Sequence, residues 1–187
     1  GEGYKGYTEE GYPLDQVSYQ SRGNARYVDL AYMYGWEGVG AIHNVYYQRI
    51  LSGSSEVHDA SNPSDSDFVF AASEGLGVNM APFFDFWGLS ITQTTLDTVN
   101  AMPRSEPVKL LLLEYREIIP RDLAEFTEWH DSIKGRIGTW QGPQVESYLD
   151  TYDDATGLAG LDRIDTLLCL YFEVNCENVP GVIPFPW

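Results

Sequence analysis

Basic residues are scarce in this chain of 187 residues, in which 11 Lys and Arg face 28 Asp and Glu for a net charge of −17. Such a field repels nucleic acid and anionic membranes, so we expect neither as a partner. Long apolar runs are missing as well. The run Leu110–Leu113, for example, is far short of the roughly 18 apolar residues that a membrane span requires. The acidic residues are scattered, which indicates a solvated surface.

Motifs for hydrolytic chemistry are also missing. A helical zinc site needs two His one turn apart with Glu between them, but none of His43, His58 and His130 has a His partner four residues away. No Ser lies in a Gly-x-Ser-x-Gly turn, and the Gly-rich stretches carry no P-loop Lys. We therefore expect no catalytic residue, no metal and no cofactor in this chain.

Two acidic segments have carboxylates of the kind that bind calcium. His58 lies among Glu56, Asp59 and neighbouring acids that could help to hold a cation such as calcium, although a solvated loop that caps a helix is the favoured interpretation. The segment 150–157 is dense in acid, but it lacks the spacing of an EF-hand loop.

Only two cysteines are present, Cys169 and Cys176, with six residues between them. A local disulfide in an extracytoplasmic protein is the favoured interpretation, and two buried thiols are the alternative. The first residues, Gly1–Gly3, have neither the basic head nor the apolar stretch of a signal peptide. We expect a secreted or cell-surface protein, of which this chain is a processed or excised part.

Apolar residues recur at helical spacing along most of the chain. After a looped lead-in, 1–20, the pattern predicts helices over 22–34, 36–51, 65–74, a short stretch around Pro82, 92–102, 108–119, from 123 to about 133, and 161–171. The end of the chain, 179–187, is Pro-rich and is expected to lie extended on the surface.

Capping residues support these boundaries. Gly35 suits the residue after a helix end, Ser64 and Asn79 suit N-caps, and Gly88 suits the end of the short helix. Gly38 and Gly40 weaken their helix, which indicates a closely packed neighbouring backbone. The fold prediction is mainly α: a helical bundle with an aromatic core that buries Phe84 and Trp87, divided near Pro103–Pro107 into two sub-regions, 1–102 and 103–187.

Three segments, Ala25–Glu37, Ser64–Val78 and Asn79–Ile91, resemble enhancin-like zinc metallopeptidases, a family that includes mucin-degrading enzymes. Ala25–Glu37 resembles the helix and Gly-Trp junction that follow the catalytic centre of that family, and Ser64–Val78 resembles its next helix. Asn79–Ile91 is similar to the family pattern of Pro-Phe-Phe, two residues and Trp-Gly, followed by a short step into a helix. The resemblance covers roughly Arg22 to Met102; the metal-binding helix has no counterpart in this chain.

The resemblance implies that this chain is a non-catalytic, helical, substrate-side part of a secreted zinc metallopeptidase that cuts glycoproteins. Zinc is then expected in the remainder of the enzyme, before Gly1. The alternative is a stand-alone extracellular module that binds glycans or a protein and has no enzymatic activity.

Three residues are candidates for substrate contact. Arg22 and Asn24 offer a charged donor and an amide beside a predicted helix start, and Trp36 follows a helix-ending Gly, from which an indole can stack on a sugar ring. In the alternative interpretation Asn24 caps the helix, Arg22 pairs with a surface acid and Trp36 fills the core.

Overall fold

The chain is helical in a computed structural model that describes residues 19–52, 64–133, 152 and 154–185. The helices, in chain order, are α2 (Tyr19–Ser52), α3 (Asp65–Leu76), α4 (Ala81–Phe86), α5 (Gln93–Val99), α6 (Glu106–Ile118), α7 (Leu123–Ile133) and α9 (Asp154–Phe172), followed by the 3-10 turn η2 (Cys176–Asn178). Within these ranges the one β-type pairing is an isolated bridge between Asn79 and Arg104. The mainly α prediction is confirmed.

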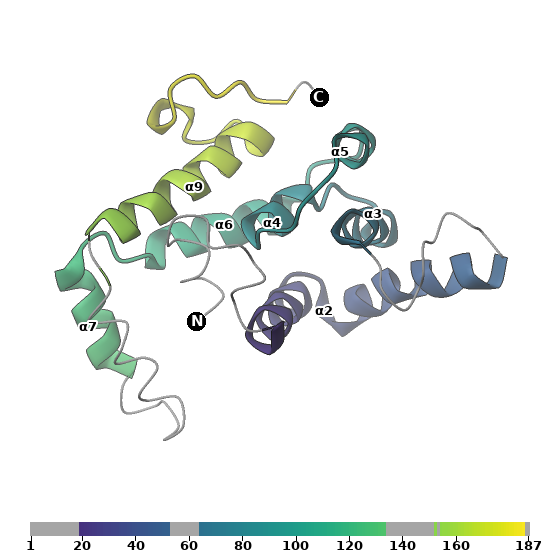
Figure 1. Cartoon of the computed structure of the whole chain (residues 1–187), viewed down its shortest axis with the longest axis horizontal. Coiled ribbons are helices and arrows are strands. Elements are labelled where there is room, and N and C mark those ends of the chain that lie inside the picture. The colour runs from purple at the N-terminus through teal and green to yellow at the C-terminus, as the bar shows by residue number, and fades with distance from the viewer. Residues whose placement is uncertain (1–18, 53–63, 134–151, 153, 186–187) are drawn as a thin grey trace.

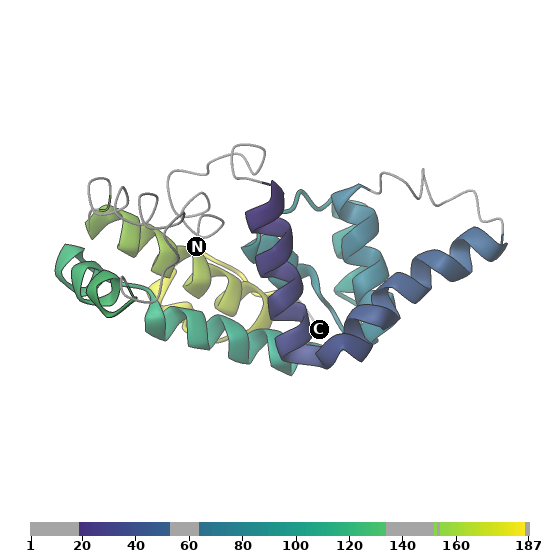
Figure 2. The same cartoon turned by 90° about the horizontal axis from the view of Figure 1, so that it is seen from below.

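Helix α2 is bent sharply at Gly35, where the backbone has φ 67° and ψ 174°. Residues other than glycine rarely adopt that conformation, because their Cβ would clash with the neighbouring peptide groups. The two halves of α2 therefore diverge, as Figure 2 shows. The predicted break after Tyr34 is confirmed, whereas the predicted helix start is wrong: α2 begins at Tyr19 and not near Arg22.

Helix α3 has the predicted N-cap and packs closely on α2. Ser64 and Asp67 form a reciprocal capping box, and Gly77 ends the helix with φ 69°. A Cβ at Gly75 would lie only 2.9 Å from the carbonyl oxygen of Ala41 on α2. The close approach of backbones is therefore at Gly75, whereas Gly40 borders open space.

The residues around α4 make up the aromatic core. Phe84 is fully buried and meets Phe83 and Phe68 edge-on, with ring centroids 5.0 and 5.1 Å apart. Trp87 is buried as well, so both burial predictions are confirmed. One apolar cluster contains these side chains together with Leu112 of α6 and Leu168 of α9. The cluster thus extends on both sides of Pro103, and the division into two sub-regions stays a prediction.

The start of α4 differs from the prediction. Met80 occupies the N-cap position and makes no side-chain cap bond. Asn79 lies one residue earlier, where its Oδ1 accepts from the N–H of Ala81 at 2.9 Å and its Nδ2 donates to Asn100 at 2.8 Å. The side chain of Asn79 thereby ties the start of α4 to the end of α5, and its backbone N–H donates to the carbonyl oxygen of Pro103.

Helices α6 and α9 lie side by side, and α4 contacts α9 (Figure 1). The side chain of Ser105 caps the start of α6, and the helix ends at Ile118, close to the predicted end at residue 119. The C-terminal segment turns back along α9, where the N–H of Phe185 donates to the carbonyl oxygen of Leu170 at 2.9 Å. Residues 182–185 form neither helix nor strand, and Phe185 packs against the core, whereas the segment was expected to lie extended on the surface. None of the helices in the described ranges is long and apolar enough to cross a bilayer.

Candidate functional site

Trp36 is the most exposed large aromatic side chain in the described part of the chain, with 72% of its surface accessible. It follows directly after the bend at Gly35, so the second half of α2 carries the indole. The interpretation in which Trp36 fills the core is therefore wrong. An indole held on a helix with its face in solvent is a platform on which the apolar face of a sugar can stack.

The other two candidate residues, Arg22 and Asn24, have their backbones in the first turns of α2, and their side chains lie outside the described residues. The helix begins at Tyr19, so neither residue lies in a loop before it. Asn24 cannot be the N-cap for the same reason. The role of Arg22 and Asn24 in substrate contact stays a prediction.

A buried carboxylate on the first half of α2 accepts hydrogen bonds from two other helices. The Oδ2 of Asp29 accepts from the Nε1–H of Trp87 at 3.1 Å. The hydroxyl of Tyr115, on α6, donates to the same carboxylate at 2.8–2.9 Å, and Phe86 stacks on the Tyr115 ring. Asp29 and Trp87 belong to two of the segments that resemble the metallopeptidase family, so these segments are in direct contact in the fold.

Burial dominates the electrostatics of this cluster. Removal from water raises the pKa of the Asp29 carboxyl above its ordinary value, although the hydrogen bonds from Tyr115 and Trp87 oppose the rise. Burial and the nearby Asp29 carboxylate raise the pKa of the Tyr115 hydroxyl. The donors are neutral and the site is filled by protein side chains, so its chemistry is that of a structural link between α2, α4 and α6.

A second polar cluster lies between α6, α9 and η2. The Asp165 carboxylate is buried and accepts from Nε and Nη2 of Arg116 at 2.6 and 3.0 Å, a bidentate pair. The side-chain amides of Asn175 and Asn178 donate to the same carboxylate at 2.8 and 3.1 Å. Burial alone would raise the pKa of Asp165, but these donors outweigh it and hold that pKa below its ordinary value.

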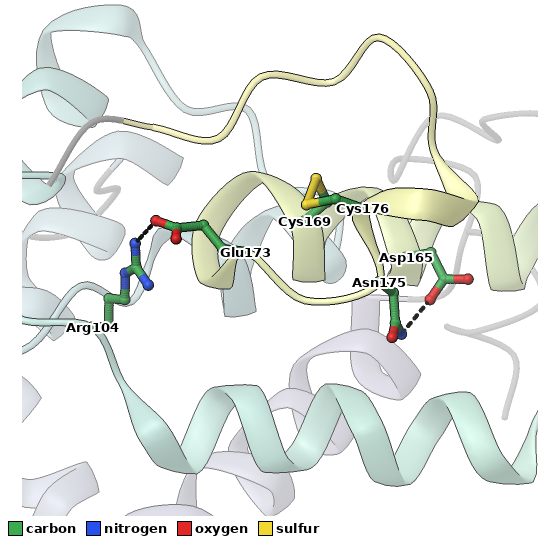
Figure 3. Close-up of a disulfide and its surroundings, with 6 residues drawn as sticks. All are labelled: Arg104, Asp165, Cys169, Glu173, Asn175 and Cys176. Carbon is green, nitrogen blue, oxygen red and sulfur yellow. Dashed lines mark hydrogen bonds and ion pairs between the residues drawn. A yellow bond between two sulfur atoms is a disulfide. The ribbon is translucent and has the colours of Figure 1, made fainter.

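A disulfide joins Cys169, on α9, to Cys176 at the start of η2. Figure 3 shows it beside the Asn175–Asp165 hydrogen bond and the ion pair between Arg104 and Glu173. Both Glu173 and Asn175 have φ 59°, so the chain reverses tightly between the two cysteines. The cross-link encloses the turn that presents Asn175 to Asp165.

In the described part of the chain, the histidines do not form a common metal site. His43 stacks on Tyr27, with ring centroids 6.0 Å apart, whereas His130 is buried near the end of α7. His58 lies outside the described residues, as do residues 150, 151 and 153 of the segment 150–157. Among the described residues, no group of three His, Cys, Asp or Glu side chains is arranged to hold a metal ion.

Sequence reasoning did not identify either buried carboxylate. The partners of Asp29 lie 58 and 86 positions away, and Arg116 lies 49 positions from Asp165. One feature of the sequence could have pointed to them: each Asp lies directly beside an apolar residue of a predicted helix. Asp29 precedes Leu30, and Asp165 follows Ile164. Comparison with known proteins adds no further residue: no protein-family model, curated protein or solved structure matches this chain.

Proposed function

We propose that this chain is the non-catalytic, substrate-side helical part of a secreted zinc metallopeptidase of the enhancin-like kind, and that it contacts glycoprotein substrates. The observation that carries the proposal is the exposed indole of Trp36, held directly after the bend at Gly35. Support also comes from the contact between two of the three segments that resemble the family, Ala25–Glu37 and Asn79–Ile91, since the hydrogen bond from Trp87 to Asp29 makes them parts of one packed unit.

In this proposal, catalysis takes place in the remainder of the enzyme. There, zinc activates the water that attacks the peptide carbonyl. The role of this chain is binding: Trp36 stacks on a sugar ring, and the exposed carboxylate of Glu37 beside it accepts hydrogen bonds from sugar hydroxyls. The disulfide between Cys169 and Cys176 fits a secreted protein, because such bonds persist in oxidising compartments.

The second candidate is a stand-alone extracellular module that binds glycans or a protein. It is favoured by the single apolar cluster that links α2, α3, α4, α6 and α9, since a continuous core allows independent folding. The coding sequence upstream of Gly1 separates the two candidates. A His-Glu-x-x-His motif there selects the peptidase, and an unrelated domain or a stop selects the module.

Binding to immobilised mucin-type glycoprotein tests the role of Trp36. Trp36→Ala should weaken binding at least about tenfold, since a buried aromatic contact contributes more than 1 kcal/mol at such sites. Tyr47→Ala is the matched control, because Tyr47 is an exposed aromatic residue farther along the same half of α2. Equal binding by wild type and Trp36→Ala would remove Trp36 from the proposed site.

Cleavage by the full-length enzyme tests the peptidase assignment. Trp36→Ala and Arg22→Ala should lower the turnover of glycosylated substrate more than that of the deglycosylated protein, with unchanged thermal stability. Zinc analysis of the isolated chain should find no stoichiometric metal. Stoichiometric zinc in this chain alone would contradict the assignment of the metal site to the remainder of the enzyme.

A further inference from the structure

We infer that exposed apolar side chains on α2 and α6 form a docking surface for a basic amphipathic helix of a partner protein. The α2–α6 surface is defined by Val28 and Tyr32 on the first half of α2 and by Leu110, Glu114, Glu117 and Ile118 on α6. It does not include Trp36, which lies beyond the bend, so it stands independently of the proposed sugar contact.

The exposure of these side chains is high and follows helical periodicity. Val28 and Tyr32 are one turn apart, and 61% and 67% of their surfaces are accessible. Leu110 and Ile118 are two turns apart on α6, with Glu114 midway between them, and are 52% and 65% exposed. Residues at such spacings share one helix face, so each helix presents a continuous outer stripe.

The two stripes meet at one point. The hydroxyl of Tyr32 donates to Oε1 of Glu114 at 3.3 Å, and both side chains are exposed. On the opposite faces of the same helices, Leu30 and Leu112 are buried in the core. The packing of α2 on α6 therefore turns both stripes toward solvent together. Apolar side chains gathered over two adjacent helices are typical of protein-binding surfaces.

The charge of the surface is acidic. Among the described residues, neither Glu114 nor Glu117 has a cation within ion-pair distance, because the basic side chains of α6 are engaged elsewhere: Lys109 pairs with Glu106, and Arg116 pairs with Asp165. A second copy of this chain, also at net charge −17, would be repelled. The complementary partner carries Lys or Arg beside its apolar residues.

We propose a helix as the bound segment. An amphipathic helix whose apolar residues lie at i, i+3, i+4 and i+7 offers one apolar stripe to the exposed side chains of α2 and α6. Basic residues on the flanks of that helix would reach Glu114 and Glu117. The surface thus combines a hydrophobic contact with charge pairing at its edge.

The experiment measures the affinity of the full chain for a synthetic amphipathic helical peptide of Leu and Lys, with versions in which Gln or Glu replaces every Lys. The Lys peptide should bind most tightly and the Glu peptide should not bind. The double variant Leu110→Ser/Ile118→Ser should weaken binding at least about tenfold. Glu114→Gln/Glu117→Gln should remove most of the preference for Lys over Gln.

The control is the double variant Tyr47→Ser/Leu51→Ser, which removes two exposed apolar side chains from the other half of α2 and should leave the affinity unchanged. All substituted positions are exposed, so the helical circular dichroism of each variant should match that of the wild type. An equal loss in the control variant, or no binding of the Lys peptide, would overturn the inference. A dimer in light scattering that Leu110→Ser/Ile118→Ser abolishes would also overturn it, in favour of self-association.

Discussion

Two buried carboxylates in this protein have opposite electrostatic surroundings. Asp29 accepts from the neutral donors of Tyr115 and Trp87, and burial raises its pKa. Asp165 accepts from the guanidinium of Arg116 as well as from two amides, and these donors lower its pKa. Both carboxylates join helices that are distant in sequence. Their contributions to stability should nevertheless change in opposite directions with pH.

Asp29→Asn should change the pH dependence of stability in a specific direction. Since folding raises the pKa of Asp29, the folded state binds more protons than the unfolded state at mildly acidic pH. The contribution of this group is then greatest below the unfolded pKa, falls as pH rises through the acid range, and levels off above the folded pKa. Urea unfolding at a series of pH values should show that the variant lacks this decline.

The control for that experiment is Glu74→Gln, an exposed carboxylate that pairs with Arg49 at the surface. It should shift the free energy of unfolding by less than about 1 kcal/mol. Asp29→Ala, which leaves the Trp87 N–H and the Tyr115 hydroxyl without their acceptor, should cost about 3 kcal/mol. Parallel pH profiles for wild type and Asp29→Asn would show that Asp29 does not titrate as the structure indicates.

Asp165→Asn should destabilise the protein by about 3 kcal/mol near neutral pH, because it removes the charged acceptor of Arg116. The folded pKa of Asp165 is depressed, so its contribution is fully present above the unfolded pKa and is lost as pH falls through the folded pKa. The difference between wild type and variant in chemical unfolding should therefore shrink on acidification. A constant difference across the acid range would contradict the assigned role.

Helix α2 shows how glycine decides the course of an element. Gly35 and Gly40 lie five positions apart, yet only Gly35 has a backbone conformation that a side chain disfavours, at φ 67° and ψ 174°. Because of the bend, Trp36 does not lie on the outer stripe that Val28 and Tyr32 form on the first half of α2. Gly40, in contrast, lies within the second half and has no atom within 4 Å of a hypothetical Cβ.

The two glycines should therefore respond oppositely to alanine. Gly40→Ala should stabilise the protein by about 0.5–1 kcal/mol, because alanine loses less backbone entropy on folding and meets no neighbour. Gly35→Ala should destabilise it by roughly 1–3 kcal/mol, since the strained backbone is retained. Thermal unfolding of both variants provides the measurement, and a change of the same sign in both would be inconsistent with the bend.

In the molecule as a whole, ion pairs link the C-terminal region to the helices before it. The carboxylate of Asp85, in α4, pairs with Arg163 of α9, and Arg104 pairs with Glu173 just after α9. The disulfide then fixes η2 to α9, close to where Asn175 reaches Asp165 (Figure 3). These links lie around the apolar cluster that α4, α6 and α9 share.

Loss of the disulfide should loosen this region. Cys169→Ala/Cys176→Ala should lower the free energy of unfolding by roughly 2 kcal/mol, the value for closure of a short loop. Reduction of the wild type should give a similar loss, whereas reduction of the variant should change nothing further. Free-thiol labelling of native material should find both cysteines blocked; two free thiols would count against a secreted protein.

The helices and most of their ends were predictable because local interactions determine them. The side chain of Ser64 caps its own helix three residues on, and Gly35 breaks α2 through its own backbone conformation. The candidate site was harder to predict from the sequence. The residues around Trp36 do not indicate whether its side chain is buried or exposed. Its exposure depends on which face of α2 packs against other helices.

The mainly α class, the apolar stripes and the aromatic composition of the core follow from the sequence alone, since periodicity and capping act over a few residues. The contacts of Asp29 with Trp87 and Tyr115, the pairing of Arg116 with Asp165, and the adjacency of the outer stripes of α2 and α6 became visible only in the folded chain. The physical reason is distance along the chain. A hydrogen bond between residues 49 to 86 positions apart depends on how whole helices pack, and helical periodicity carries no information about that packing.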